Sequence, residues 1–353
     1  MCLDLNGQTD GNDGPYRHEG QVMAPRGAEP MEVTKTDADI IWLFDIQAKV
    51  GVHQHDAAHS SILLHGQFLY INTSNGLDTN HKYIPAPDAP SLIVLEKTTG
   101  RLIAQEDEKI STRIFHCTWS SPALGQVNGR TLVFFCGGDG VCYAFDALRY
   151  ATETSVVQKL KNVWWFDCDP TAPKENIHRY IGNRQESPSN IKSMPVFHKG
   201  RVYVTHGGDI WWGKEQSWLK CIDATGTGDV TNSREIWSYP LNSHCCSTPS
   251  VHNGLVFVAD CGGYIHCVDA ETGKPYWTHE TGDEIWASTL VADGKVYIGT
   301  RRGNFWILAA NRDKKIVSSI KLDSPIHGSP VVANGVLYIA TMKKLYAVKK
   351  SSE

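Results

Sequence analysis

The sequence lacks the features of several functional classes. It has no run of about eighteen apolar residues, so we expect no membrane-spanning helix. Lys and Arg number 34 against 38 for Asp and Glu, which gives a net charge of −4, and no block of like charge stands out. Nucleic acids and anionic membrane surfaces are recognised by basic faces, so we expect neither as a partner.

Several catalytic and targeting motifs are also missing. The sequence contains no Gly-rich phosphate loop, no nucleophile elbow and no ordered Ser-His-Asp set. Residues 1–20 are polar and rich in Gly and Asp, and they lack the basic and then apolar layout of a secretory signal. The compartment therefore does not follow from these residues.

The cysteines do not form the pattern of a metal knuckle. Ten are present, but no pair has CxxC spacing, which argues against a zinc knuckle. Cys245 and Cys246 are adjacent; a strained vicinal disulfide is one option, and a pair of free thiols is the one we favour. Others lie within or beside strand-like runs, where Cys acts as a small buried apolar residue: Cys136, Cys142, Cys221, Cys261 and Cys267.

A repeated pattern is clearest in residues 251–280, VHNGLVFVADCGGYIHCVDAETGKPYWTHE. Hydrophobic runs separated by tight turns predict four short antiparallel strands, the last carrying Trp277. The pattern recurs, because Gly254 and Gly294 are 40 residues apart and Gly294 and Gly335 are 41 apart. One such sheet cannot bury its own faces and must stack on its neighbours. The sequence therefore predicts an all-β fold, a β-propeller of four-stranded antiparallel blades.

Six blade units and a partial one at the N-terminus are recognisable. We expect a single domain over residues 1–353, with residues 8–38 as a polar insertion in the partial blade, and an intact ring of seven or eight blades. Residues 2–7 resemble the third strand and turn at 267–273, so the chain begins partway through a blade. Either the C-terminus supplies the first strands or an upstream part is missing, and we favour the second. The turn glycines marking the units are Gly66, Gly129, Gly200, Gly254, Gly294 and Gly335.

Long insertions interrupt the first three units at residues 72–90, 167–190 and 206–216. On a rigid scaffold, such loops are where recognition residues are placed. One Trp in the last strand of several units is predicted to close its blade and to lie in the core: Trp42, Trp165, Trp237 and Trp277.

The position just ahead of the Ser/Thr-rich start of each inner strand is predicted to form a ring at the mouth of the central channel. These aligned positions are Ala58, Trp119, Lys192, Cys246, Trp286 and His327. Such a ring could cup a small planar ligand or a sugar, or it could only fill a narrow funnel. His116, Arg184 and His244 lie close to the ring in sequence and are further candidates.

Two sets of residues suggest metal ligands. His53 and His55 would share one face of a strand, with His59 nearby, and neutral imidazoles suit zinc or copper. HxH pairs are common without a metal. Asp78 and Asp88 in the first polar loop could bind calcium through oxygen, although such Asp residues more often cap turns.

The turn at residues 269–273 followed by Trp277 resembles the tryptophan-docking repeat of the pyrroloquinoline quinone (PQQ)-like propellers, and residues 95–100 and 221–224 are weaker copies. This family includes quinoprotein alcohol dehydrogenases and the scaffold protein of outer-membrane β-barrel assembly. The likeness runs from Ile40 onward and implies the fold rather than one function. It also implies a bacterial protein that is periplasmic or secreted, although ten cysteines without evident pairing suit a reducing cytosol.

When the chain is compared with the dehydrogenases, the resemblance implies that Asn75 occupies the position of an Asn that helps hold calcium beside the quinone. A His-Asp-x-Trp-Asp run supplies the catalytic carboxylate in that family. The corresponding residues 116–120 carry Cys117 and Ser120 in the two acidic places. Neither a protonated thiol nor a hydroxyl is a good base.

We therefore predict a binding or scaffold module for a protein or carbohydrate, without an intact quinoprotein catalytic set. One alternative is a dehydrogenase that uses PQQ and calcium to oxidise an alcohol or a sugar. Another is a cofactor-free enzyme such as a sugar lyase, with His116, Lys192 or His327 as the base.

Overall fold

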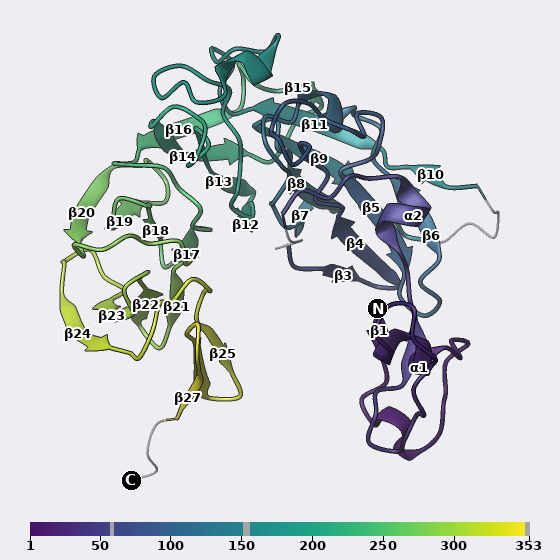
Figure 1. Cartoon of the computed structure of the whole chain (residues 1–353). Coiled ribbons are helices and arrows are strands. Elements are labelled where there is room, and N and C mark those ends of the chain that lie inside the picture. Colours follow the sequence, from purple (N-terminus) through teal and green to yellow (C-terminus); the bar gives the residue numbers. More distant parts are fainter. Residues whose placement is uncertain (57–59, 151–155, 350–353) are drawn as a thin grey trace.

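The computed structural model describes residues 1–56, 60–150 and 156–349. Short antiparallel strands form six successive sheets, and in Figure 1 these sheets follow an arc from the blue N-terminal blades to the yellow C-terminal one. The predicted all-β propeller fold of four-stranded antiparallel blades is confirmed. The two ends of the arc, β1 and β27, lie apart in this view.

The first three complete sheets contain the long insertions. Strands β10 and β15 add to the outer edges of the first and second sheets through parallel pairing. The first sheet contains β3 (Leu63–His65), β4 (Phe68–Asn72), β5 (Leu92–Glu96), β6 (Leu102–Gln105) and β10 (Gln158–Lys159). The second contains β7 (Ala123–Val127), β8 (Arg130–Cys136), β9 (Val141–Asp146), β11 (Asn162–Asp167) and β15 (Gly228–Asp229). The third contains β12 (Val196–His198), β13 (Arg201–Gly207), β14 (Ser217–Asp223) and β16 (Glu235–Pro240).

The remaining sheets are more regular, and the last one has three strands within the described residues. Their strands are β17 (Ser250–His252), β18 (Leu255–Ala259), β19 (Tyr264–Asp269) and β20 (Pro275–Glu280); β21 (Leu290–Ala292), β22 (Lys295–Gly299), β23 (Asn304–Ala309) and β24 (Ile316–Lys321); and β25 (Val331–Ala333), β26 (Val336–Ala340) and β27 (Leu345–Lys349).

The N-terminal segment forms a small unit of its own beside the first sheet. Strands β1 (Cys2–Leu3) and β2 (Ile40–Trp42) pair antiparallel, with Cys2 opposite Trp42. The helices are single turns, and none in the described part of the chain is long or apolar enough to cross a membrane. They are η1 (Gly7–Thr9), α1 (Glu19–Met23), α2 (Ile46–Val50), η2 (Ile110–Arg113) and η3 (Ile177–Tyr180).

The predicted turn glycines all have positive φ. In the hairpin from β17 to β18, Asn253 and Gly254 have φ of 49° and 76°. Two successive residues with positive φ are the requirement of the type I′ turn, whose twist matches that of the flanking strands. Four other inner hairpins repeat this pair: Asn128-Gly129, Lys199-Gly200, Asp293-Gly294 and Asn334-Gly335.

The hydrophobic core lies between neighbouring sheets rather than within any one of them. Phe134 and Val204 belong to one buried cluster, which joins the second and third sheets. Phe257 and Ile298 belong to another, which joins the fourth and fifth. Each sheet therefore depends on its neighbours for burial, as stacked repeats do.

A tryptophan in the last strand of four sheets docks on the next sheet. The indole N–H of Trp277 donates to the Asn311 carbonyl oxygen at 2.9 Å. Trp42 and Trp237 make the same contact with Lys97 and Ala270. In the second sheet the docking residue is Trp164, which is fully buried and donates to the Ala224 carbonyl. The prediction of Trp165 is wrong, since that side chain is 37% exposed.

Candidate functional site

Five of the six aligned ring residues line one cavity of about 650 Å³. Each lies four residues ahead of the first residue of its inner strand, as Trp119 does before Ala123 of β7. The repeat therefore places equivalent side chains at one end of the arc of inner strands. The five residues are Trp119, Lys192, Cys246, Trp286 and His327; Ala58 lies outside the described residues.

A row of hydroxyl groups borders the same cavity and joins adjacent sheets. The backbone N–H of Ser61 donates to Ser121 Oγ at 2.8 Å. Met194 N–H donates to Thr248 Oγ1 at 3.0 Å. The same contact continues from Thr248 to Ser288 and from Ser288 to Ser329, both at 2.9 Å. These interblade hydroxyl bonds explain the Ser/Thr-rich starts of the inner strands.

The third insertion, residues 206–216, adds aromatic surface to the cavity. Ile210 and Trp211 line it. The Trp211 ring centroid lies 6.1 Å from that of Trp119 and 5.9 Å from that of Trp286, where the rings are perpendicular. Arg301 stacks on Trp286, with its guanidinium carbon 4.2 Å from the ring centroid. Sequence reasoning singled out the loop but did not assign Trp211 to the cavity.

Lys192 does not present a free charge to a ligand. Its Nζ lies 3.1 Å from Asp209 Oδ2 and donates to Asn190 Oδ1 at 2.7 Å. Nζ also lies 5.2 Å from the Trp119 ring centroid. The cavity wall is therefore aromatic and nearly neutral at this point.

Asp209, which sequence reasoning missed, is the centre of a buried polar network. Its Oδ2 accepts from His116 Nδ1 at 3.1 Å and from Asn190 Nδ2 at 3.0 Å, and its Oδ1 accepts two backbone N–H groups of the same loop. Burial alone would raise the pKa of Asp209, but the charge of Lys192 and the hydrogen bond from His116 hold it well below its usual range. No repeat pattern marks this residue, because it lies on an insertion.

Two of the cavity groups have shifted pKa values. A hydrogen bond from the Cys261 thiol, with the sulfurs 4.0 Å apart, lowers the pKa of Cys246, although burial opposes this. Burial and the nearby Arg301 lower the pKa of His327, so its imidazole is neutral at pH 7. The adjacent Cys245 does not bond to Cys246; its thiol donates to the Ala259 carbonyl.

Three other predicted residues lie outside the cavity lining. His116 is buried behind Trp119, with perpendicular rings whose centroids are 4.9 Å apart. Arg184 donates to the Ile210 carbonyl at 3.2 Å and so supports the third insertion. His244 is buried, and its Nε2 lies 2.9 Å from the Lys214 carbonyl oxygen.

The calcium candidates have partners within the fold. Asn75 Oδ1 accepts the His53 N–H, and its Nδ2 donates to Ala86 and Ser111. Asp78 accepts backbone N–H groups from residues 80, 82 and 83, in the way of a turn cap. The calcium role of both residues stays a prediction, as does that of Asp88.

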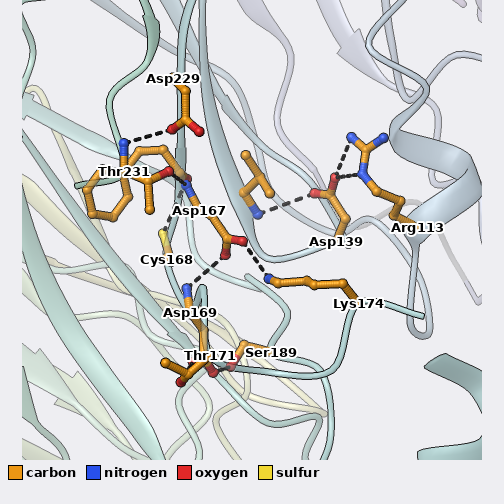
Figure 2. A network of polar contacts seen from close by, with 12 residues as sticks. Arg113, Asp139, Asp167, Cys168, Asp169, Thr171, Lys174, Ser189, Asp229 and Thr231 are labelled. Carbon is orange, nitrogen blue, oxygen red and sulfur yellow. Dashed lines mark hydrogen bonds and ion pairs between the residues drawn. The ribbon is translucent and has the colours of Figure 1, made fainter. Parts of the chain in front are cut away.

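A second polar network lies beside the second sheet (Figure 2). Arg113 pairs with Asp139 at 3.1 Å, and Lys174 pairs with Asp167 at 2.6 Å. Asp229 accepts the Thr231 N–H at 3.0 Å. Arg113, Asp167, Asp229 and Thr231 border a cavity of about 460 Å³, but each of them has a partner within the fold. We assign them a structural role.

Part of the chain matches a known protein family and known enzymes. Residues 193–285, 215–314 and 262–351 match the family described as outer membrane protein assembly factor BamB. A quinohemoprotein alcohol dehydrogenase, ADH IIB of Pseudomonas putida, is 25% identical over 165 residues, which are 42% of this chain and 19% of the relative. The 1-butanol dehydrogenase (cytochrome c) of Thauera butanivorans is 30% identical over 170 residues, 42% of this chain and 24% of the relative. The chain thus matches a quarter or less of the length of these relatives.

Two solved structures share the architecture. BamB from Moraxella catarrhalis has a TM-score of 0.55 at 14% identity and covers 81% of this chain and 70% of its own. The quinohemoprotein alcohol dehydrogenase from Comamonas testosteroni has a TM-score of 0.52 at 13% identity, covering 80% of this chain and 51% of its own. At these identities the likeness shows the fold alone.

Proposed function

Because the chain is built from PQQ-like propeller repeats and is homologous to quinohemoprotein alcohol dehydrogenases, we propose that it is a binding module whose central cavity holds a neutral carbohydrate. The single observation that carries the proposal is the convergence of three indole rings and a row of hydroxyl groups on one cavity. Its volume of about 650 Å³ lies within the range of roughly 300–1,000 Å³ that is usual for small-ligand pockets.

The chemistry of the lining supports a sugar over a charged ligand. Lys192 is neutralised by Asp209, and His327 is neutral at pH 7. The flat faces of Trp119 and Trp286 can contact the apolar C–H faces of a pyranose. The hydroxyl groups of Ser121 and Ser329 line the cavity and can both donate and accept bonds to sugar hydroxyls.

The test is a titration of the protein with cellotriose, maltotriose and chitotriose, followed by tryptophan fluorescence and calorimetry. We expect one of these trisaccharides to bind with a stoichiometry of one and to change the emission of the cavity indoles. Trp286→Ala should weaken this binding by at least about tenfold. Trp165→Ala is the matched control, because that indole lies on β11 and does not line the central cavity. Equal binding by the two variants, or no binding by the wild type, would reject the proposal.

A protein ligand is the second candidate. It is favoured by the match of residues 193–351 to the BamB family, which is named for outer membrane protein assembly. Peptides taken from strands of an outer membrane protein should then change the same fluorescence where the trisaccharides do not. That result would identify the ligand of the cavity as a polypeptide and not a carbohydrate.

The residues fit a quinone and calcium centre poorly. Asp56 is the single carboxylate lining the central cavity within the described residues. At the positions that carry acids in the dehydrogenases, Cys117 and Ser120 are fully buried, and burial raises the pKa of Cys117 further. Neither of these two positions therefore supplies the carboxylate base of the dehydrogenases. Turnover of an alcohol in a dye-linked assay with added PQQ and calcium would contradict this conclusion.

A further inference from the structure

Three histidines from separate parts of the chain meet beside the central cavity. His55 precedes the first complete sheet, His81 lies in the loop between β4 and β5, and His116 precedes β7. One ring nitrogen of each lies within 4.8 Å of those of the other two. The pairs of ring centroids are 4.7, 4.8 and 5.0 Å apart. This His cluster differs from the predicted HxH pair, since it lacks His53, and His59 lies outside the described residues.

The hydrogen bonds of His55 and His116 fix where their ring protons lie. His55 Nδ1 is 2.8 Å from the Leu77 carbonyl oxygen, which can only accept, so Nδ1 carries the hydrogen. His116 Nδ1 is 3.1 Å from Asp209, a carboxylate paired with Lys192, so it too carries the hydrogen. In a neutral imidazole the other nitrogen then presents a lone pair.

These two lone pairs point at each other. His55 Nε2 and His116 Nε2 are 2.9 Å apart, and both rings are buried. Two acceptor nitrogens in contact repel unless an electrophile lies between them. That electrophile is either a proton, which makes one ring an imidazolium, or a metal ion, which both nitrogens bind.

The surroundings favour a metal ion. His81 brings a third imidazole to the same point and is held by the Trp212 ring, whose centroid is 5.1 Å away. A shared proton would need only two rings. The carboxylate behind His116 and the carbonyl behind His55 are the outer contacts that orient metal-binding histidines and raise their basicity.

We propose that His55, His81 and His116 bind one divalent transition-metal ion, with zinc the best match to three imidazoles. Zinc binds imidazole nitrogen at about 2.0–2.1 Å, and tetrahedral ligands at that distance are about 3.3 Å apart. The two facing nitrogens therefore need to separate by only about 0.4 Å. Asp56 Oδ1 lies 3.8 Å from His55 Nε2 and lines the cavity, so the fourth position faces the cavity and takes Asp56 or a water.

The test uses untagged protein treated with EDTA and then titrated with Zn²⁺, with Ca²⁺ as the comparison ion. We expect one Zn²⁺ per chain by calorimetry, and no Ca²⁺ binding at this site because calcium prefers oxygen ligands. Co²⁺ should give the visible absorption bands of a tetrahedral site. Zn²⁺ should also raise the unfolding temperature, since it binds only the folded arrangement.

The informative variant is His81→Asn. His81 has a φ of 56°, a left-handed conformation that Asn tolerates well, and it is the least buried of the three. Its loss should weaken Zn²⁺ binding by about 100-fold or more. His53→Ala is the matched control, which should bind Zn²⁺ as the wild type does.

Circular dichroism of the metal-free variants shows that they have folded; if His81→Asn fails to fold, His81→Gln takes its place. Three results would overturn the proposal. They are a wild type that binds no stoichiometric Zn²⁺, a folded His81 variant that binds Zn²⁺ unchanged, and a His53→Ala variant that loses binding. The first would leave the facing nitrogens sharing a proton.

Discussion

At the scale of single residues, Asp209 shows how much of the site depends on one side chain. It is fully buried and accepts hydrogen bonds from His116, Asn190 and two backbone N–H groups, besides its ion pair with Lys192. Through Lys192 it sets the charge of the cavity wall, and through His116 it orients the His cluster. The chain places this carboxylate on the third insertion, between β13 and β14, where sequence periodicity gives no information.

Glu106 is the residue for which we expect a pH effect. Burial raises its pKa to about 7 from 4.5, although backbone N–H groups of Ser91 and Glu108 oppose this. A carboxyl whose pKa is higher in the folded than in the unfolded protein contributes stability that is fully present below the unfolded pKa. That contribution is lost as the pH rises through the folded pKa of about 7. The free energy of unfolding should therefore fall by up to about 3 kcal/mol between pH 5 and pH 8.

Urea unfolding of the wild type and Glu106→Gln at both pH values measures this contribution. The difference between the two proteins cancels groups that titrate in both, such as the buried His206. We expect the variant to lose less stability with rising pH than the wild type. Parallel pH profiles for the two proteins would show that Glu106 titrates normally.

At the scale of elements, the sequence predicted the turns and docking tryptophans well because they depend on local chemistry. The Asn-Gly turns and the Trp277 strand follow from short patterns alone. The one error, Trp165 for Trp164, has a physical cause. A register shift between Asn162 and Trp164 interrupts the pairing of β11 with β9, and a shift of one residue turns a side chain to the other face of a sheet. Two adjacent tryptophans cannot be separated without that shift.

Two of the docking tryptophans, Trp42 and Trp237, pack closely against a glycine of the next sheet. A Cβ at Gly273 would lie 2.6 Å from the Trp237 ring, whereas one at Gly254 would meet nothing within 4 Å. Both glycines have positive φ, 70° and 76°, so Ala at either position carries a similar backbone cost of about 1 kcal/mol. The overlap with Trp237 should add roughly 1–3 kcal/mol at Gly273.

Thermal unfolding of Gly273→Ala and Gly254→Ala compares the two positions directly. The Gly273 variant should have the lower unfolding temperature. Equal values for the pair would mean that the docking contact between the third and fourth sheets contributes little to stability.

At the scale of the whole molecule, the repeat decided what could be predicted of the site. Five ring residues were predicted because each sheet presents the same position to the cavity. Trp211, Asp209 and His81 were missed because they lie on insertions, which have no counterpart in the other units. These three residues come together only because separate loops fold over the mouth of the cavity. No short sequence pattern shows which residues of different loops lie close together.

The arc also predicts uneven stability along the chain. Strand β18 is buried between two neighbouring sheets, whereas Val331 and Leu345 of the last sheet are 56% and 69% exposed. Because each sheet is stabilised by its neighbours, we expect amide hydrogens of β26 to exchange about 100-fold faster than those of β18. Hydrogen–deuterium exchange with mass spectrometry measures this. Equal protection of both strands would mean that the arc unfolds only as one unit.

The interblade hydroxyl bonds have a consequence for mechanical stiffness. Ser61 bonds to Ser121, and the series resumes at Met194, but a thioether side chain offers no hydroxyl to the second sheet. At this joint, His116 from one side and Asp209 from the other bridge the two sheets instead. Bonds to hydroxyl groups therefore link the starts of the inner strands at the other joints, while at this one the link is a buried contact between a carboxylate and a histidine of the His cluster. Metal supply should therefore act on the flexing of the arc at this joint before it acts on it elsewhere.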